Sequence, residues 1–164
     1  MSIIRQAAFI GSQRLLKGAL HCHTTRSDGK GSPEEVIRLH KQNGYDFMAL
    51  TDHRNYNYKN YAPETDMLIL PGMEMDRSIE GRPGVHCFHI VCLGKPEGEN
   101  PYAQDQLFES GTVQDQHQMQ SLLDQWHEDG QLTIYCTPSG ATPPPASSIS
   151  STATLPWRSG TAAA

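Results

Sequence analysis

Apolar and polar positions alternate along the chain in blocks of two kinds. Five short apolar runs have the length and residue types of buried strands. They occupy residues 18–24, 47–53, 67–76, 86–94 and 132–136. Two longer segments, residues 32–44 and 112–130, carry apolar residues at helical spacing. Strands alternating with helices predict the α/β class.

The helix predicted over residues 32–44 has signals at both ends. Ser32 is a good N-cap, Pro33 suits the first helical position and Glu35 completes a capping box, while Gly44 ends the pattern. The later helix is expected to direct a set of apolar side chains inward, namely Val113, Met119, Leu122, Leu123 and Trp126.

Polar residues gather where the predicted strands end. These residues are His21 and His23, Asp52 and His53, Glu74 and Asp76, and His86 and His89. In α/β folds the chemistry collects at the carboxyl ends of parallel strands. The tyrosine-rich run over residues 55–61 is interpreted as a surface loop, with a pocket wall as the alternative.

Composition and charge narrow the functional classes. The 164 residues carry a formal net charge of −5, so we expect no stable nucleic-acid partner. No segment has the apolar length of a membrane span and the N-terminus does not resemble a signal peptide, so a cytoplasmic protein is expected. The four cysteines form no C-x-x-C pair and are interpreted as free thiols in a reducing compartment.

The chain divides into three parts by composition. Residues 1–17 form an N-terminal extension, and residues 18–136 form one domain with a core of its own. Residues 137–164 consist almost entirely of Thr, Pro, Ser, Gly and Ala, with no acidic residue and no histidine. Such a segment cannot bury enough apolar surface to fold, so a disordered tail is predicted.

Six residues form a candidate multinuclear metal site that activates water. They are His21, His23, Asp28, His53, Glu74 and His89. Residues i and i+2 of a strand point the same way, so His21 and His23 would aim at one ion. Each residue also has an ordinary interpretation, such as a turn at Asp28. Ligand-type residues at four successive strand ends are hard to attribute to chance.

These motifs resemble those of the PHP (polymerase and histidinol phosphatase) family over residues 18–136. The motif H-x-H-x4-D-G is matched by His21, His23, Asp28 and Gly29, the motif T-D-H by Thr51, Asp52 and His53, and the later positions by Glu74 and His89. The resemblance, closest to the small stand-alone members, implies a distorted seven-stranded α/β barrel. It also implies up to three divalent ions, zinc, manganese or iron, and hydrolysis of small phosphate esters.

The resemblance also implies a role for each ligand. His21, His23 and Glu74 would hold one ion, Glu74 would bridge to a second ion held by His89, and Asp28 with His53 would hold a third.

Three further residues are candidate catalytic residues by the same resemblance. Asp52 is expected to orient His53. Arg26 and Arg54 flank the motifs and are expected to grip the substrate phosphate, with ordinary surface charge as the alternative.

The C-terminal part departs from the family pattern. Thr137-Pro138 stands where a His-Pro pair is expected, and no Asp-x-His follows. A one-base deletion in codons for Cys-His-Pro-Glu-Trp-Ser would give the Cys-Thr-Pro-Ser-Gly-Ala of residues 136–141. We therefore hypothesise a frameshifted, truncated chain with about five barrel strands, poor stability and impaired phosphoesterase activity.

Two alternative functions stay open. An amidohydrolase-type hydrolase also begins with His-x-His after a strand, although the Ser-Asp-Gly and Thr-Asp-His motifs argue against it. A non-catalytic metal-binding or regulatory module is favoured by the missing ligands. The substrate cannot be identified, since a barrel hosts many chemistries.

Overall fold

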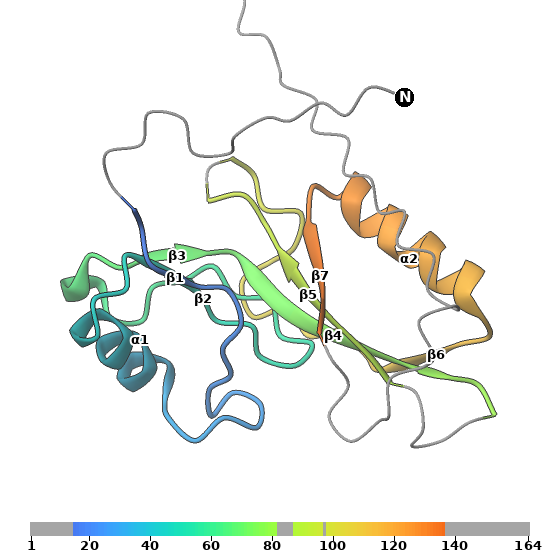
Figure 1. The fold of residues 1–164 in the computed structure, drawn as a ribbon, viewed down its shortest axis with the longest axis horizontal. Coiled ribbons are helices and arrows are strands. Elements are labelled where there is room, and N and C mark those ends of the chain that lie inside the picture. Colours follow the sequence, from blue (N-terminus) through green and yellow to red (C-terminus); the bar gives the residue numbers. More distant parts are fainter. Residues whose placement is uncertain (1–14, 82–86, 97, 137–164) are drawn as a thin grey trace, which may run out of the picture.

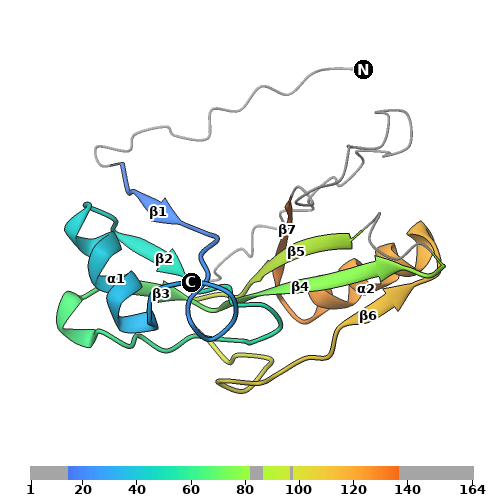
Figure 2. The same cartoon turned by 90° about the horizontal axis from the view of Figure 1, so that it is seen from below.

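The computed structural model describes residues 15–81, 87–96 and 98–136 (Figure 1). The predicted tail and His86 lie outside the described residues, as does most of the predicted N-terminal extension. The described part contains two sheets, each with a helix beside it (Figure 2). The prediction of an α/β protein is confirmed.

The first sheet is parallel. It has the order β1-β2-β3 and consists of β1 (Gly18–Ala19), β2 (Phe47–Ala49) and β3 (Leu68–Leu70). β1 and β2 are shorter than the predicted runs 18–24 and 47–53, because the residues after Ala19 and Ala49 leave the ladder. The helix α1 (Pro33–Gln42) and the short 3-10 helix η1 (Pro63–Thr65) belong to the connections of this sheet.

The second sheet is mixed and has the order β6-β4-β5-β7. Its strands are β4 (Gly72–Ile79), β5 (Cys87–Leu93), β6 (Gly111–Val113) and β7 (Leu132–Cys136). β5 runs antiparallel to both β4 and β7, whereas β6 is parallel to β4. The predicted third strand is two strands, because Pro71 separates β3 from β4. The described residues thus form seven strands rather than about five.

Helix α1 begins and ends where its sequence signals predict. The Ser32 hydroxyl accepts the Glu35 N–H at 3.3 Å, and the Glu35 carboxylate accepts the Ser32 N–H at 2.8 Å. Asn43 is the C-cap and Gly44 follows with a φ of +77°, a conformation that favours glycine. Ile37 is fully buried and packs in a cluster with Met48 of β2.

Helix α2 (Gln116–Glu128) is shorter than predicted. Asp115 is its N-cap and accepts the N–H groups of His117 and Gln118 at 2.9 Å each. The predicted start was wrong because the preceding residues pair with β4 as strand β6, so Val113 is buried in the sheet. The helix packs its apolar side chains on one face of β4 and β5 in a cluster that includes Met73, Met75, Ile90, Cys92, Met119 and Trp126.

The tyrosine-rich segment is not simply a surface loop. Tyr56 is fully buried, and its ring lies edge-on to Tyr102 at a centroid distance of 5.2 Å. Its backbone N–H donates to Gln106 O at 3.0 Å. Tyr58 lies nearer the surface. Tyr56 was not predicted as a core residue because its neighbours in the sequence are polar.

Among the described residues, neither helix has the length and apolar character that a bilayer crossing requires.

Candidate metal centre

The candidate ligands lie where the two sheets meet. His21 and His23 follow β1, and His53 follows β2, while Glu74 and His89 lie within β4 and β5. An isolated parallel bridge between His53 and Glu74 joins the end of the first sheet to the second. Backbone pairing therefore brings together ligand-type residues that are far apart in the chain.

The carboxylate of Glu74 is the centre of this cluster, and its side chain is only 3% exposed. Its Oε2 atom lies 3.0 Å from His23 Nε2, 3.4 Å from His21 Nε2 and 3.3 Å from His53 Nδ1. Its Oε1 atom lies 3.2 Å from His89 Nδ1. One buried carboxylate thus faces four imidazoles.

Asp28 extends the cluster toward solvent. Its Oδ1 lies 3.0 Å from His23 Nδ1 and its Oδ2 lies 3.6 Å from His53 Nε2. The imidazoles of His23 and His53 therefore stand between two carboxylates, each ring directing one nitrogen to Glu74 and the other to Asp28.

His89 reaches the site by a route that the sequence interpretation had wrong. It does not end a parallel strand but lies near the start of β5, which runs antiparallel to β4. The register pairs His89 with Asp76, two residues beyond Glu74. Because the strand direction is reversed, the first half of β5 lies at the same edge as the carboxyl ends of the first sheet.

His21 and His23 converge although the predicted strand around them is absent. β1 ends at Ala19, yet His21 Nε2 and His23 Nε2 lie 2.8 Å apart. The intervening Cys22 is held to the second motif, because its N–H donates to Thr51 Oγ1 at 3.0 Å and its carbonyl accepts the Thr51 N–H at 2.8 Å.

The donor set fits divalent ions. Nitrogen and oxygen ligands of one tetrahedral zinc ion lie about 3.4 Å apart, close to the 3.0–3.4 Å between Glu74 and its imidazoles. His53 Nδ1 is buried and has no hydrogen-bond partner among the described residues. It is 3.3 Å from Glu74 Oε2 without the geometry of a hydrogen bond, so an ion between the two atoms would satisfy both.

Electrostatics favour the charged form of the central carboxylate. Burial acts to raise the pKa of Glu74, but hydrogen bonds with His21 and His23 and the nearby charges of His21 and His53 together outweigh it and hold the pKa well below its usual range. The hydrogen bond with Glu74 raises the pKa of His23. Protons on the imidazoles and divalent cations therefore compete for the same negative charge.

The Asp52 side chain was expected to orient His53, but its hydrogen bonds go to other residues. Its fully buried carboxylate accepts the Thr24 N–H at 2.7 Å, the Thr24 hydroxyl at 2.8 Å and the Ser27 hydroxyl at 2.8 Å. Between Asp52 and His53, the described structure shows no side-chain hydrogen bond. Asp52 instead holds the loop that carries His23 and Asp28.

Both candidate arginines are already paired. The Arg26 guanidinium forms an ion pair with Asp105 and donates to Tyr61 Oη at 2.6 Å and to Asn55 Oδ1 at 2.9 Å. Arg54 forms an ion pair with Asp76. Arg26 is thereby committed to protein partners, including Asp105, which is 79 residues away in the chain.

A pocket of 450 Å³ adjoins the ligands. It is lined by Arg26, Ser27, Asp28, His53, Arg54, Leu107 and Phe108. Arg54 has a left-handed backbone with a φ of 56°, which is uncommon for a residue with a side chain. Its N–H donates to Glu74 O at 2.7 Å and its carbonyl accepts the Phe108 N–H at 2.8 Å. The backbone of Arg54 is therefore hydrogen-bonded on one side to Glu74 and on the other to Phe108, which lines the pocket.

One further ligand-type residue was missed. Cys136 was interpreted only as a free thiol, but its Sγ lies 3.4 Å from His21 Nδ1. His21, Glu74 and Cys136 form one of two described groups whose donor atoms could share an ion, and His23, His53 and Glu74 form the other. The signal was available in the sequence, because Cys136 is the last residue of a predicted strand and cysteine is a common metal ligand.

Parts of the chain are similar in sequence to two known proteins. The chain is 38% identical to the DNA polymerase/3'-5' exonuclease PolX of Bacillus subtilis, in a match that covers 37% of this chain and 14% of that protein. It is 35% identical to a 5'-3' exoribonuclease of Haemophilus influenzae, with 41% and 26% covered. The matches span well under two thirds of either relative.

A solved structure and a family of domains were also compared with the chain. The structure of an amidohydrolase from Chromobacterium violaceum, with bound sulfate and no metal, matches at a TM-score of 0.39 and 31% identity. That match covers 50% of this chain and 29% of the other. The pattern of the PHP domain matches residues 19–136, which include the candidate ligands and the pocket. The chain therefore belongs to the PHP domain family.

Proposed function

We propose that this PHP domain is a metal-dependent phosphoesterase that acts on small phosphate esters. The observation that supports the proposal is the convergence of four imidazoles on the buried carboxylate of Glu74, with Asp28 at the solvent side. Such a donor set suits zinc, manganese or iron.

The chain's own residues divide into three ligand groups. His21 and His23 with Glu74 would hold one ion, Glu74 and His89 a second, and Asp28 with His53 a third. When bound, divalent ions activate water as a nucleophile and neutralise the charge on a phosphoryl group. Glu74 serves two of these groups because each of its oxygens faces a different set of imidazoles.

The pocket beside Asp28 and His53 is the proposed substrate site. Its lining residues include Arg54 and the apolar residues Leu107 and Phe108. Arg54 is paired with Asp76 but is 37% exposed, against 18% for Arg26, so its free N–H groups would orient a phosphate oxygen while the apolar residues cover the rest of the ester. Arg26 and Asp52 act as positioning residues, because their polar atoms bind neighbouring parts of the protein.

We further propose that the activity of this chain is low. Thr137 stands where the PHP pattern implies a histidine, so one ion would lack a ligand. This same observation favours the second candidate function, a non-catalytic metal-binding module. The two functions differ in whether metal-loaded protein turns over any phosphate ester.

The test is a phosphate-ester screen of protein loaded with zinc or manganese. We expect weak metal-dependent release of phosphate, which Thr137→His increases. Glu74→Gln should lose both bound metal and activity, whereas His127→Asn on α2, whose Nε2 bonds Thr133 Oγ1 at 2.8 Å, should retain both. Metal binding without turnover, even in Thr137→His, would support the non-catalytic module. Turnover that persists in Glu74→Gln would contradict the proposed site.

A further inference from the structure

We infer that the thiolate of Cys136 is a metal ligand, sharing an ion with His21 and Glu74, and that it makes this position selective for zinc over manganese. The inference rests on the proposed function in that the centre holds divalent ions. It adds a soft sulfur donor to a set otherwise made of imidazoles and carboxylates, and thiolates select zinc over manganese and magnesium.

Cys136 lies close to the donor atoms of His21 and Glu74. Cys136 Sγ lies 3.4 Å from His21 Nδ1, and the donor atoms of Cys136, His21 and Glu74 all lie within 4.8 Å of one another. Sulfur and nitrogen ligands of one tetrahedral zinc ion, at about 2.3 Å and about 2.0 Å from the metal, are about 3.6 Å apart. The other ring nitrogen of His21, Nε2, is the one that faces Glu74, and one ion takes only one of the two nitrogens. The thiol therefore lies close enough to share an ion with His21 and Glu74 after small side-chain rotations.

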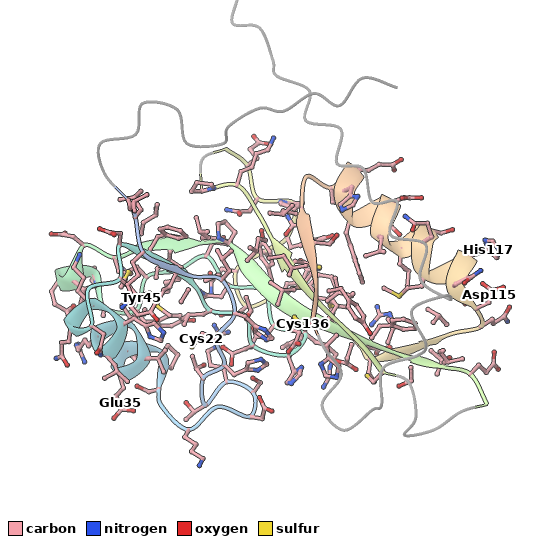
Figure 3. All side chains as sticks on the ribbon, viewed as in Figure 1. Cys22, Glu35, Tyr45, Asp115, His117 and Cys136 are labelled. Carbon is pink, nitrogen blue, oxygen red and sulfur yellow. The ribbon has the colours of Figure 1, made fainter. Side chains whose placement is uncertain are left out.

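Strand pairing also places Cys136 on the same face of the sheet as the candidate ligands. β7 pairs with β5 so that Cys136 is directly opposite His89, and His89 is directly opposite Asp76 of β4. Directly opposed residues point to the same face of a sheet, as do residues two apart on one strand. Cys136, His89 and Glu74 therefore share a face, so strand pairing places the sulfur on the face that carries the ligands. Figure 3 labels Cys136 at the end of β7.

The other described cysteines are placed differently. Cys92 is fully buried in the cluster beneath α2, on the opposite face of the sheet. Cys22 packs against the cluster around Met48, and its Sγ contacts the His23 carbonyl at 3.8 Å. Cys87 lies two residues before His89 at the start of β5. Among the described cysteines, Cys136 alone belongs to a group of metal-ligand atoms.

The experiment is a cobalt titration of the full chain, read by the near-ultraviolet absorption that a thiolate–cobalt bond produces. We expect this band in wild type and in the matched control Cys87→Ser, and its loss in Cys136→Ser. Zinc affinity should fall at least about tenfold in Cys136→Ser, since disturbing the surroundings of a ligand alone costs that much. Manganese affinity should change little, so that the zinc preference falls.

A second readout uses the wild-type chain and is independent of how well Cys136→Ser folds. Zinc should protect Cys136, and not Cys87, from iodoacetamide, as mapped by mass spectrometry. Cobalt binding without the thiolate band, or an unprotected Cys136 in zinc-loaded protein, would overturn this inference and leave the histidine–carboxylate centre in place. Wild type that binds neither cobalt nor zinc would overturn the inference together with the proposed function.

Discussion

Glu74 shows how much of this site depends on one side chain. Each imidazole of the cluster lies within 3.4 Å of one of its two oxygens. The carboxylate is buried, so water cannot replace it as a partner for the histidines. Removal of this charge therefore affects two of the three proposed ions directly and the third through its contact with His53, whereas a change at the exposed Asp28 affects one side of the cluster.

The buried thiol of Cys92 gives a testable prediction about its reactivity. Burial raises the pKa of its thiol to about 12, and only the thiolate reacts with alkylating reagents. We expect Cys92 to resist iodoacetamide in folded protein at pH 8, while the half-buried Cys87 is labelled. Mass spectrometry of a labelling time course checks this. Rapid labelling of Cys92 without denaturant would show that the core beneath α2 opens readily.

The sequence predicted individual ligands better than their partners. His21, His23 and Asp28 lie within one short motif, so spacing alone drew attention to them. The pairing of Arg26 with Asp105 joins residues that no local pattern connects. Arg26 was therefore expected to grip a substrate, although its charge is already paired within the protein.

The capping box of α1 gives a prediction about the stability of the folded chain. Ser32→Ala removes the side chain that accepts the Glu35 N–H, which typically costs about 1 kcal/mol of stability. Urea unfolding should show this loss. The matched control is Ser121→Ala within α2, where the hydroxyl only donates to the His117 carbonyl one turn earlier. Equal losses in the two variants would contradict a specific capping role.

Helix α2 gives a pH-dependent prediction. The backbone N–H of Gln118, above all, holds the pKa of Asp115 below its usual range. Its stabilising charge is therefore fully present above the unfolded pKa of about 3.9 and is lost as pH falls through the lower folded pKa. Asp115→Asn keeps a capping oxygen that does not titrate. The stability of wild type relative to this variant should fall between pH 5 and pH 2, as measured by urea unfolding; a constant difference would contradict it.

Element type was predictable where local chemistry decides it, and not where pairing decides it. The capping box and Gly44 marked both ends of α1. Residues 112 and 113 were assigned to a helix because Val113 continues its apolar spacing, but they pair with β4. The reversed direction of β5 also depends on a hairpin that apolar spacing does not reveal.

At the scale of the whole molecule, the candidate centre joins the two sheets. His21, His23 and His53 follow strands of the parallel sheet, while Glu74, His89 and Cys136 belong to the mixed sheet. The meeting of the sheets is held in the backbone by the bridge from His53 to Glu74. The site was predictable as a cluster, but its location between two sheets was not, because no apolar pattern shows where one sheet ends.

A bound ion should therefore stabilise the whole fold. Zinc at 100 times its dissociation constant is expected to add about 2.7 kcal/mol, because the ligands come together only in the folded chain. Thermal unfolding with zinc and with a chelator checks this as a shift in Tm. Glu74→Gln should abolish the shift and His127→Asn should preserve it. An unchanged Tm in saturating zinc would contradict binding to the folded state.

The exposure of Asp28 bears on how samples of this protein should be handled. Its side chain is 70% exposed and that of His21 is 38% exposed, so the centre is open to its surroundings on that side. Ions held there would trade places with those in the buffer, and free imidazole from affinity chromatography would compete for them. The element found in a purified batch then records its preparation history, and a native occupant has to be identified in material that never met a chelator.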